Sequence, residues 1–331
     1  DEMVAELKKF TGDNDPEKSF RQISLKTYAK VAEDKADSKT SKNQIAIVYA
    51  EGEIVNGQGG IGQVGGDRLA KQLRDLRLDD DVKAIVLRVN SPGGSATASE
   101  IIQREAILTA KEKPVIVSMG NVAASGGYWI STYANRIFAE PTTITGSIGV
   151  FGRLLNVKKL ANENGVTWDV VKTGKFADVQ TISRPKTPKE LEIIQASVNR
   201  TYDQFITKVA DSRKLEKSKV SEIAQGRVWS GVEAKSLGLV DQIGGLEDAV
   251  RAAAEQAKLG NDWQIEEYPK SRSFEQRLIE TLTSSISVQS KPAIDPLTSE
   301  MKKLQSQLES LKAMNDPHDI YLRLPFDLSI R

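Results

Sequence analysis

PVIVSMGNVAASGGYWIS, residues 114–131, contains the strand and the turn that decide the fold of this chain. The run at 114–119 is short and apolar, as expected of a buried strand. AASGG at 123–127 follows, and a second apolar run begins at Tyr128. Ser125 therefore stands at a strand-to-helix junction between residues with very small side chains, which leave room for a substrate carbonyl. Because the amide after the serine can donate to an oxyanion, Ser125 is a candidate nucleophile.

Apolar runs alternate with helical patterns through the middle of the chain. The pattern predicts strands over 44–49, 83–89, 114–119, 136–139 and 168–171, and helices over 67–78, 98–111, 158–164, 188–213, 231–237 and 246–257. Strands that alternate with helices are typical of crossover units, so we expect an α/β fold with a largely parallel sheet. Strands that are apolar along nearly their whole length predict that helices cover both faces of this sheet.

The composition excludes several classes of protein. The chain has 331 residues, a net charge of +1, no cysteine and a single histidine, His318. The balanced charge gives no electrostatic reason to expect a nucleic-acid partner. Without cysteine there are no thiolate nucleophiles or cysteine zinc sites, and one histidine offers no histidine pair for a metal. We therefore predict no metal and no cofactor.

Three regions differ in composition. Residues 1–42 are polar and charged, which indicates a lead-in that ends in a linker, and residues 43–260 hold the predicted strands and most of the helices. Residues 261–331 form a C-terminal extension with a short apolar stripe at helical spacing: Met301, Leu304, Leu308, Leu311 and Met314. No apolar run reaches the roughly 18–20 residues that cross a bilayer. The chain begins without methionine, so a mature form, a fragment of a longer protein or a truncated product is expected.

Three glycine-rich turns follow predicted strands: NSPGGS at 90–95, AASGG at 123–127 and TGSIGV at 145–150. In α/β sheets, ligand sites gather at the carboxyl ends of the strands, so these turns predict one cleft with exposed backbone N–H groups. A further glycine-rich run at 59–66 lacks the lysine and hydroxyl residue of a phosphate-binding loop.

A serine nucleophile needs a base that accepts its proton. His318 lies in a polar stretch far from the predicted sheet in sequence, and we interpret it as a surface residue. A Ser-His-Asp triad is therefore not predicted. The usual remaining base is a lysine that burial keeps neutral.

These motifs resemble the signal peptide peptidase A family, also called protease IV, whose members are Ser-Lys peptidases. The matching stretches are AIVLRVNSPGG at 84–94, VSMG at 117–120, AASGGYWIS at 123–131, TGSIGV at 145–150 and AQGRVWSG at 224–231, and NDP at 315–317 resembles the end of the long bacterial form. The resemblance runs from about residue 44 to residue 256. It implies a crotonase/ClpP-like fold with repeated ββα-type units.

The resemblance also assigns roles to residues. Ser125 would be the nucleophile, and the amides of Gly93 and Gly126 would form the oxyanion hole. The substrate would be an extended peptide beside the cleft, such as a cleaved signal peptide. The family further implies an anchor in the inner membrane, a catalytic part on the periplasmic side and a homotetramer.

The sequence departs from the family at the base. Short members carry the lysine in a segment of the type Gly-x-Tyr/Phe-Lys, and the corresponding run here is GKFAD at 174–178, with Ala177 at the lysine position. On an extended segment Lys175 would lie about 6–7 Å from that position, so we predict that neither Lys175 nor Lys172 is the base. In the long form one half gives the lysine and the other half gives the serine. This chain resembles the serine-bearing half, with its base and its anchor in a preceding half.

Two other interpretations stay open at this stage. Crotonase-like enzymes of the same fold stabilise acyl-CoA enolates without a serine nucleophile. A serine followed by two glycines, as at Ser125, would have no role in that mechanism. Alternatively, the chain is a half that serves assembly and has no activity of its own. Tyr128 and Trp129 could line a pocket or belong to the core.

Overall fold

The computed structural model describes residue 8, residues 41–269 and residues 314–324. The chain divides into two compact units, residues 1–42 and 43–331, and the fold below is that of the second. The predicted lead-in and linker, except Lys8, Ser41 and Lys42, lies outside the described residues. The same holds for the predicted helix over 301–314, apart from Met314.

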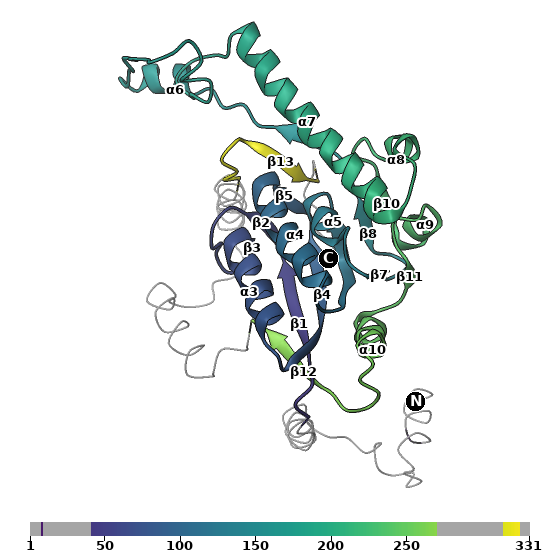
Figure 1. Ribbon diagram of the computed structural model, residues 1–331. Helices are drawn as coiled ribbons and strands as arrows, with labels where there is room; N and C mark the ends of the chain where they lie inside the picture. Colours follow the sequence, from purple (N-terminus) through teal and green to yellow (C-terminus); the bar gives the residue numbers. More distant parts are fainter. Residues whose placement is uncertain (1–7, 9–40, 270–313, 325–331) are drawn as a thin grey trace. The chain divides into compact units, whose positions relative to one another are not determined.

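A large sheet of eight strands forms the centre of the second unit (Figure 1). Its main path runs in the order β10-β8-β6-β4-β1-β12, and β7 pairs with both β6 and β11. All pairings are parallel except that of β10 with β8. The strands are β1 (Gln44–Glu51), β4 (Val82–Ser91), β6 (Val115–Ala124), β7 (Arg136–Ala139), β8 (Ile144–Gly146), β10 (Val228–Ser230), β11 (Gln242–Ile243) and β12 (Gln264–Tyr268).

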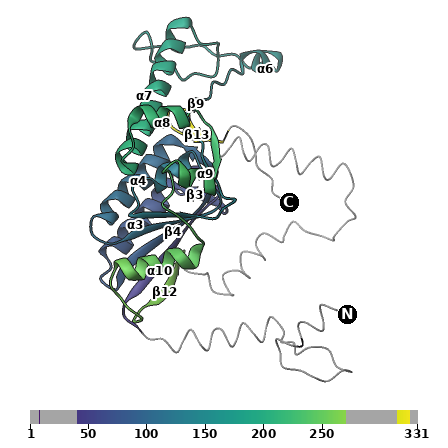
Figure 2. The same ribbon diagram turned by 90° about the vertical axis from the view of Figure 1, so that its right-hand side faces the viewer.

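Helices cover both faces of this sheet (Figure 2). On β1, Ala46 and Val48 pack with α3 and α4, whereas Ile45 and Ile47 pack with α10 on the opposite face. Successive side chains of a strand point to opposite faces, so each central strand needs apolar residues along its length. The helices are α3 (Gly66–Leu78), α4 (Ala96–Ala110), α5 (Gly126–Ser131), α6 (Lys158–Glu163), α7 (Pro188–Arg213), α8 (Lys217–Ile223), α9 (Gly231–Ser236) and α10 (Leu246–Gln256). The predicted α/β fold with a mostly parallel, helix-covered sheet is confirmed.

A second sheet of five strands lies at the carboxyl ends of the central strands. Its order is β3-β2-β5-β13-β9, and β13 is antiparallel to both of its neighbours. These strands have four residues or fewer: β2 (Glu53–Val55), β3 (Gln63–Gly65), β5 (Gly93–Ser95), β9 (Phe151–Gly152) and β13 (Ile320–Arg323). Both β12 and β13 come from residues 261–331, so parts of the C-terminal extension complete the two sheets.

The predicted strand over 168–171 is wrong. These residues belong to no strand, and Trp168 and Val171 are 44% and 98% exposed. A strand forms only where a neighbour accepts and donates its backbone hydrogen bonds. The segment 153–187 extends beyond the large sheet, where the described residues offer no such neighbour.

Among the described residues, no helix combines the length and the apolar character needed to cross a membrane.

Candidate functional site

Ser125 links the end of β6 to the start of α5 in a strained backbone conformation. Its φ is 53° and its ψ is −110°, values that residues other than glycine adopt rarely. A sharp strand-to-helix turn of this kind presents the nucleophile in α/β-hydrolases. The Ser125 amide donates to the carbonyl of Gly146 at 2.9 Å, and its hydroxyl donates to the carbonyl of Gly149 at 3.4 Å. The turn at 145–150 therefore binds both the backbone amide and the side-chain hydroxyl of Ser125.

The three predicted glycine-rich turns meet at this serine. A side-chain carbon on Gly127 would lie 2.7 Å from the Ser91 carbonyl oxygen, and one on Gly126 would lie 3.2 Å from the Cα of Gly93. Real side-chain carbons do not come within 2.7 Å of a carbonyl oxygen. Position 127 must therefore be glycine for the turn to approach β4. The predicted convergence of the turns at the carboxyl ends of the strands is confirmed.

The two glycines whose amides are expected to bind an oxyanion lie beside each other. A side-chain carbon on Gly93 would be 2.7 Å from the Gly126 nitrogen. The φ of Gly93 is 99°, a left-handed conformation that favours glycine. Its amide donates to the Ser91 hydroxyl at 3.1 Å, whereas the Gly126 amide, first in α5, has no acceptor within the helix. Both amides could bind a carbonyl oxygen only if the Gly93 amide exchanged the Ser91 hydroxyl for that oxygen.

The site is closed, although an open cleft was expected. Ser125 is 0% exposed, and the cavities of about 840, 390 and 200 Å³ in the described part of the chain are lined by other residues. Strand β13 borders the site, because it pairs with β5 at Gly93 and contacts α5, which begins directly after Ser125. Residues far apart in sequence therefore border the turn that holds the serine.

Tyr128 and Trp129 belong to the core. Both are at most 2% exposed, and burial raises the pKa of Tyr128 above its ordinary value. The Tyr128 hydroxyl donates to the Leu239 carbonyl at 2.8 Å, and the Trp129 ring packs on Phe205 with centroids 4.8 Å apart. These contacts hold α5 against the elements around α7, so neither side chain lines a substrate pocket.

Comparison with known proteins gives the family. The model of Peptidase family S49 matches residues 107–260, and that of Clp protease matches residues 37–144. "Putative signal peptide peptidase SppA" of Enterococcus faecium is 35% identical over 74% of this chain and 70% of its own length. The chain belongs to peptidase family S49. The resemblance proposed from the motifs is thus confirmed, and the Clp protease match agrees with the fold.

Other S49 relatives are longer than this chain. "Protease 4" of Salmonella typhi is 43% identical over 95% of this chain and 51% of its own length. "Serine protease SPPA, chloroplastic" of Arabidopsis thaliana is 38% identical over 78% of this chain and 39% of its own length. The chain spans about half the length of the Protease 4 relative.

The S49 segment expected to carry a lysine base forms turns. The amides of Ala177 and Val179 donate to the carbonyls of Gly174 and Phe176, so this run is not extended. Lys175 is exposed, and its ammonium lies 5.6 Å from the centre of the Phe176 ring. Within residues 41–269 and 314–324, no lysine makes a hydrogen bond to the Ser125 hydroxyl.

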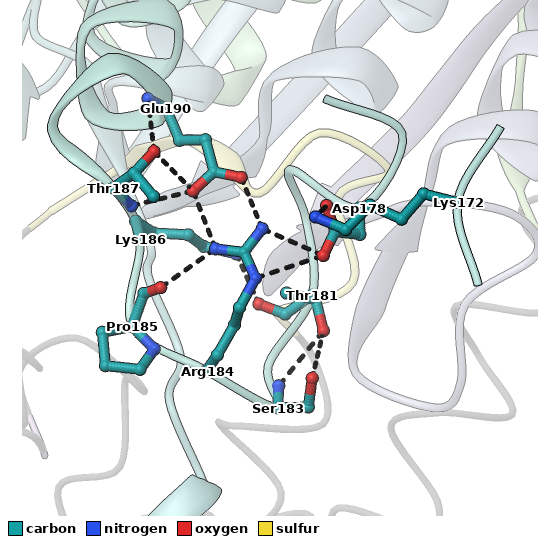
Figure 3. Close-up of polar contacts among 9 residues, drawn as sticks. All are labelled: Lys172, Asp178, Thr181, Ser183, Arg184, Pro185, Lys186, Thr187 and Glu190. Atoms are coloured by element: carbon teal, nitrogen blue, oxygen red, sulfur yellow. Dashed lines mark hydrogen bonds and ion pairs between the residues drawn. The ribbon is translucent and has the colours of Figure 1, made fainter. Parts of the chain in front are cut away.

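Lys172 belongs to a different cluster on the same segment (Figure 3). Its ammonium lies 2.7 Å from the Asp178 carboxylate, and the Arg184 guanidinium bridges Asp178 at 2.9 Å and Glu190 at 2.6 Å. Glu190 also accepts the amide of Thr187, the capping residue of α7. The bonds from Arg184 and Thr187 hold the pKa of Glu190 well below its usual range. This cluster fixes the segment 172–187 to the start of α7.

Other candidate groups lie away from the serine. The His318 side chain is exposed and lines the 200 Å³ cavity together with Arg153 and Lys186. No group of three or more metal-ligating side chains occurs in the described part of the chain. Sequence reasoning missed Asp316, whose carboxylate accepts the Ser95 hydroxyl at 2.6 Å and the Thr97 amide at 2.9 Å. The only signal was the NDP motif itself, which does not reveal the partner.

Proposed function

We propose that this chain supplies the nucleophile and the oxyanion hole of a serine peptidase with a Ser-Lys dyad. Ser125 is the nucleophile, and the amides of Gly93 and Gly126 bind the oxyanion. The observation that carries the proposal is the strained turn at Ser125, which directly precedes Gly126 at the point where Gly126 packs against Gly93. The strain costs about 1–3 kcal/mol, and such strain clusters at functional sites.

The proposed reaction proceeds through an acyl-enzyme. The Ser125 oxygen attacks a peptide carbonyl while a neutral lysine takes the hydroxyl proton. The carbonyl oxygen becomes negative between the amides of Gly93 and Gly126, each of which is worth about 2.7–4 kcal/mol in comparable sites. The lysine then returns the proton to the leaving amine. Water, activated by the same lysine, hydrolyses the acyl-enzyme and frees Ser125.

We propose that the lysine comes from outside the described residues. Lys175 and Lys172 are engaged with Phe176 and Asp178, and Ala177 stands at the position that bears the lysine in short members. A base donated by another half of the same polypeptide is compatible with relatives that are about twice as long.

The substrates, the membrane and the assembly are part of the same proposal. The substrates are cleaved signal peptides and other membrane-derived peptides, degraded at the periplasmic side of the inner membrane by an enzyme anchored through a segment outside this chain. The enzyme is a homotetramer. Large exposed apolar side chains support an assembly surface: Leu154, Leu155, Leu160, Val166, Trp168, Val170, Val171, Phe176, Ile182, Leu191 and Ile193.

Labelling with a fluorophosphonate tests the proposal on the full-length gene product. We expect labelling and peptide hydrolysis in the unmodified protein and loss of both in Ser125→Ala. Ser212→Ala is a matched control, because this serine also donates to a backbone carbonyl but lies on α7. Labelling that survives in Ser125→Ala would refute the assignment. An unmodified protein that is folded but unlabelled would favour a non-catalytic assembly half.

A further inference from the structure

The C-terminal strand β13 occupies the edge of β5 that borders Ser125 (Figure 1, yellow). Leu322 lies opposite Gly94 and Arg323 lies opposite Gly93, in antiparallel register. On its other side β13 pairs with β9, where Tyr321 lies opposite Phe151. The strand is thus inserted between the glycine turn after β4 and the turn that contacts the serine hydroxyl.

The backbone of β13 touches both glycines of the proposed oxyanion hole. The Leu322 carbonyl oxygen lies 2.0 Å from the place of a side-chain carbon on Gly93 and 3.0 Å from that of one on Gly126. Downstream, the Leu324 amide donates to the Pro92 carbonyl at 3.0 Å. One edge of a strand offers a single row of backbone donors and acceptors, so two peptides cannot pair with it at once.

Side chains hold β13 along its length and just before its N-terminal end. The Asp316 carboxylate accepts the Ser95 hydroxyl and the Thr97 amide at the start of α4, and Arg153 pairs with Asp319 at 2.7 Å. The Tyr321 ring stacks on Phe151 with centroids 5.8 Å apart. The Leu322 side chain is 0% exposed and packs in the main apolar cluster. The space that it fills therefore suits an apolar side chain.

We propose that residues 320–324 are an internal pseudosubstrate. The strand fills the slot in which a peptide would pair with β5, and it must leave before a peptide can reach Ser125. An entering peptide would run antiparallel to β5 and would place an apolar side chain where Leu322 lies. This inference rests on the proposed peptidase function, and it adds the direction of the substrate, one side-chain preference and a closed resting state.

A disulfide between β13 and β9 tests whether the strand must move. Ile320 lies opposite Gly152, and the bond from the Arg153 amide to the Asp319 carbonyl makes 320 and 152 a non-hydrogen-bonded pair. Such pairs have Cα atoms about 4.5 Å apart, within the range of about 4.4–6.8 Å that disulfides span. This chain has no cysteine, so Ile320→Cys with Gly152→Cys creates one defined bond in it. Each single substitution is the control for oxidation itself.

The full-length double variant is labelled with fluorophosphonate and assayed on an apolar peptide, before and after reduction. We expect the oxidised form to lose about tenfold or more of both rates, because the competent fraction falls, and the reduced form to regain them. Oxidised protein that keeps the rates of the reduced form would overturn the proposal. It would show that β13 stays in place while Ser125 reacts. Labelling of the unmodified protein that does not depend on Ser125 would instead contradict the proposed function.

A second variant loosens β13 from its place without any introduced cysteine. Asp316→Ala removes one of the contacts that hold β13, and we expect Ser125 to be labelled several-fold faster than in the unmodified protein. Asp248→Ala is the matched control, because this carboxylate likewise accepts a backbone amide at a helix start, that of Gly245 at 2.9 Å. Equal labelling rates in the two variants would also overturn the proposal.

Discussion

The amide of Ser125 donates to the carbonyl of Gly146, and this bond joins the end of β6 to the end of β8 at the point where the chain turns into α5. β6 and β8 run parallel, with Ala124 opposite Gly146. The amide of Ser125 therefore extends the hydrogen bonding between β6 and β8 by one residue. Its φ of 53° then turns the chain away from the sheet and into α5. The sheet itself supports the strained residue.

This geometry predicts that glycine is more stable than alanine at position 125. Glycine adopts φ 53° and ψ −110° freely, whereas alanine retains the strain. We expect Ser125→Gly to exceed Ser125→Ala by about 1–2 kcal/mol in the free energy of unfolding. Urea titration of both variants measures the difference, and both lack the hydroxyl, so activity does not affect the comparison. Equal stabilities would show that the turn is relaxed in solution.

Gly126→Ala tests the close packing around the turn. The added carbon would lie 2.7 Å from the Ser99 hydroxyl and 3.0 Å from the Leu322 carbonyl oxygen, so one of them must move. We expect a loss of about 1–3 kcal/mol of stability, typical of overpacking, together with slower labelling of Ser125. Gly174→Ala is the control, because nothing lies within 4 Å of its added carbon and its φ is not left-handed. A Gly126→Ala protein as stable as Gly174→Ala would contradict the packing.

Much of the large sheet could be predicted from the sequence, because its signals are local. The strands β1, β4 and β6 are apolar on both faces, and Leu69, Leu73 and Leu76 mark the buried side of α3. The turn around Ser125 could be predicted as well, because small residues directly after an apolar strand indicate a tight turn. These features depend on neighbours in the sequence, which the pattern records.

The second sheet and the strand that borders the site could not be predicted in this way. β5 consists of Gly93, Gly94 and Ser95, which have low strand propensity and are strands only because β2 and β13 bond to them. The residues that border the Ser125 turn come from positions 320–323, about two hundred residues away in sequence. In the segment 168–171, conversely, the apolar pattern predicted a strand, although the described residues offer it no neighbouring strand.

Tyr128→Phe tests the assignment of this residue to the core. The variant removes the donor to the buried Leu239 carbonyl and leaves the packing of the ring intact. We expect a loss of about 1–2 kcal/mol in the free energy of unfolding, because the carbonyl loses its partner. The KM for an apolar peptide should not change. A changed KM at unchanged stability would place Tyr128 at a substrate pocket instead.

Glu190 should contribute to the pH dependence of stability. The bonds from Arg184 and Thr187 lower its pKa in the folded state, so the folded protein binds the proton less readily than the unfolded chain. The stabilisation that ionised Glu190 gives to the folded protein is therefore complete above the ordinary carboxyl pKa of about 4.3. It is lost as the pH falls below that value toward the lowered pKa. Thermal unfolding measured between neutral and acidic pH should show a smaller acid-induced fall in Tm for Glu190→Gln than for the unmodified protein. Glu192→Gln, on the exposed side of the same helix, should follow the unmodified curve. A parallel curve for Glu190→Gln would mean that the Arg184 cluster does not form in solution.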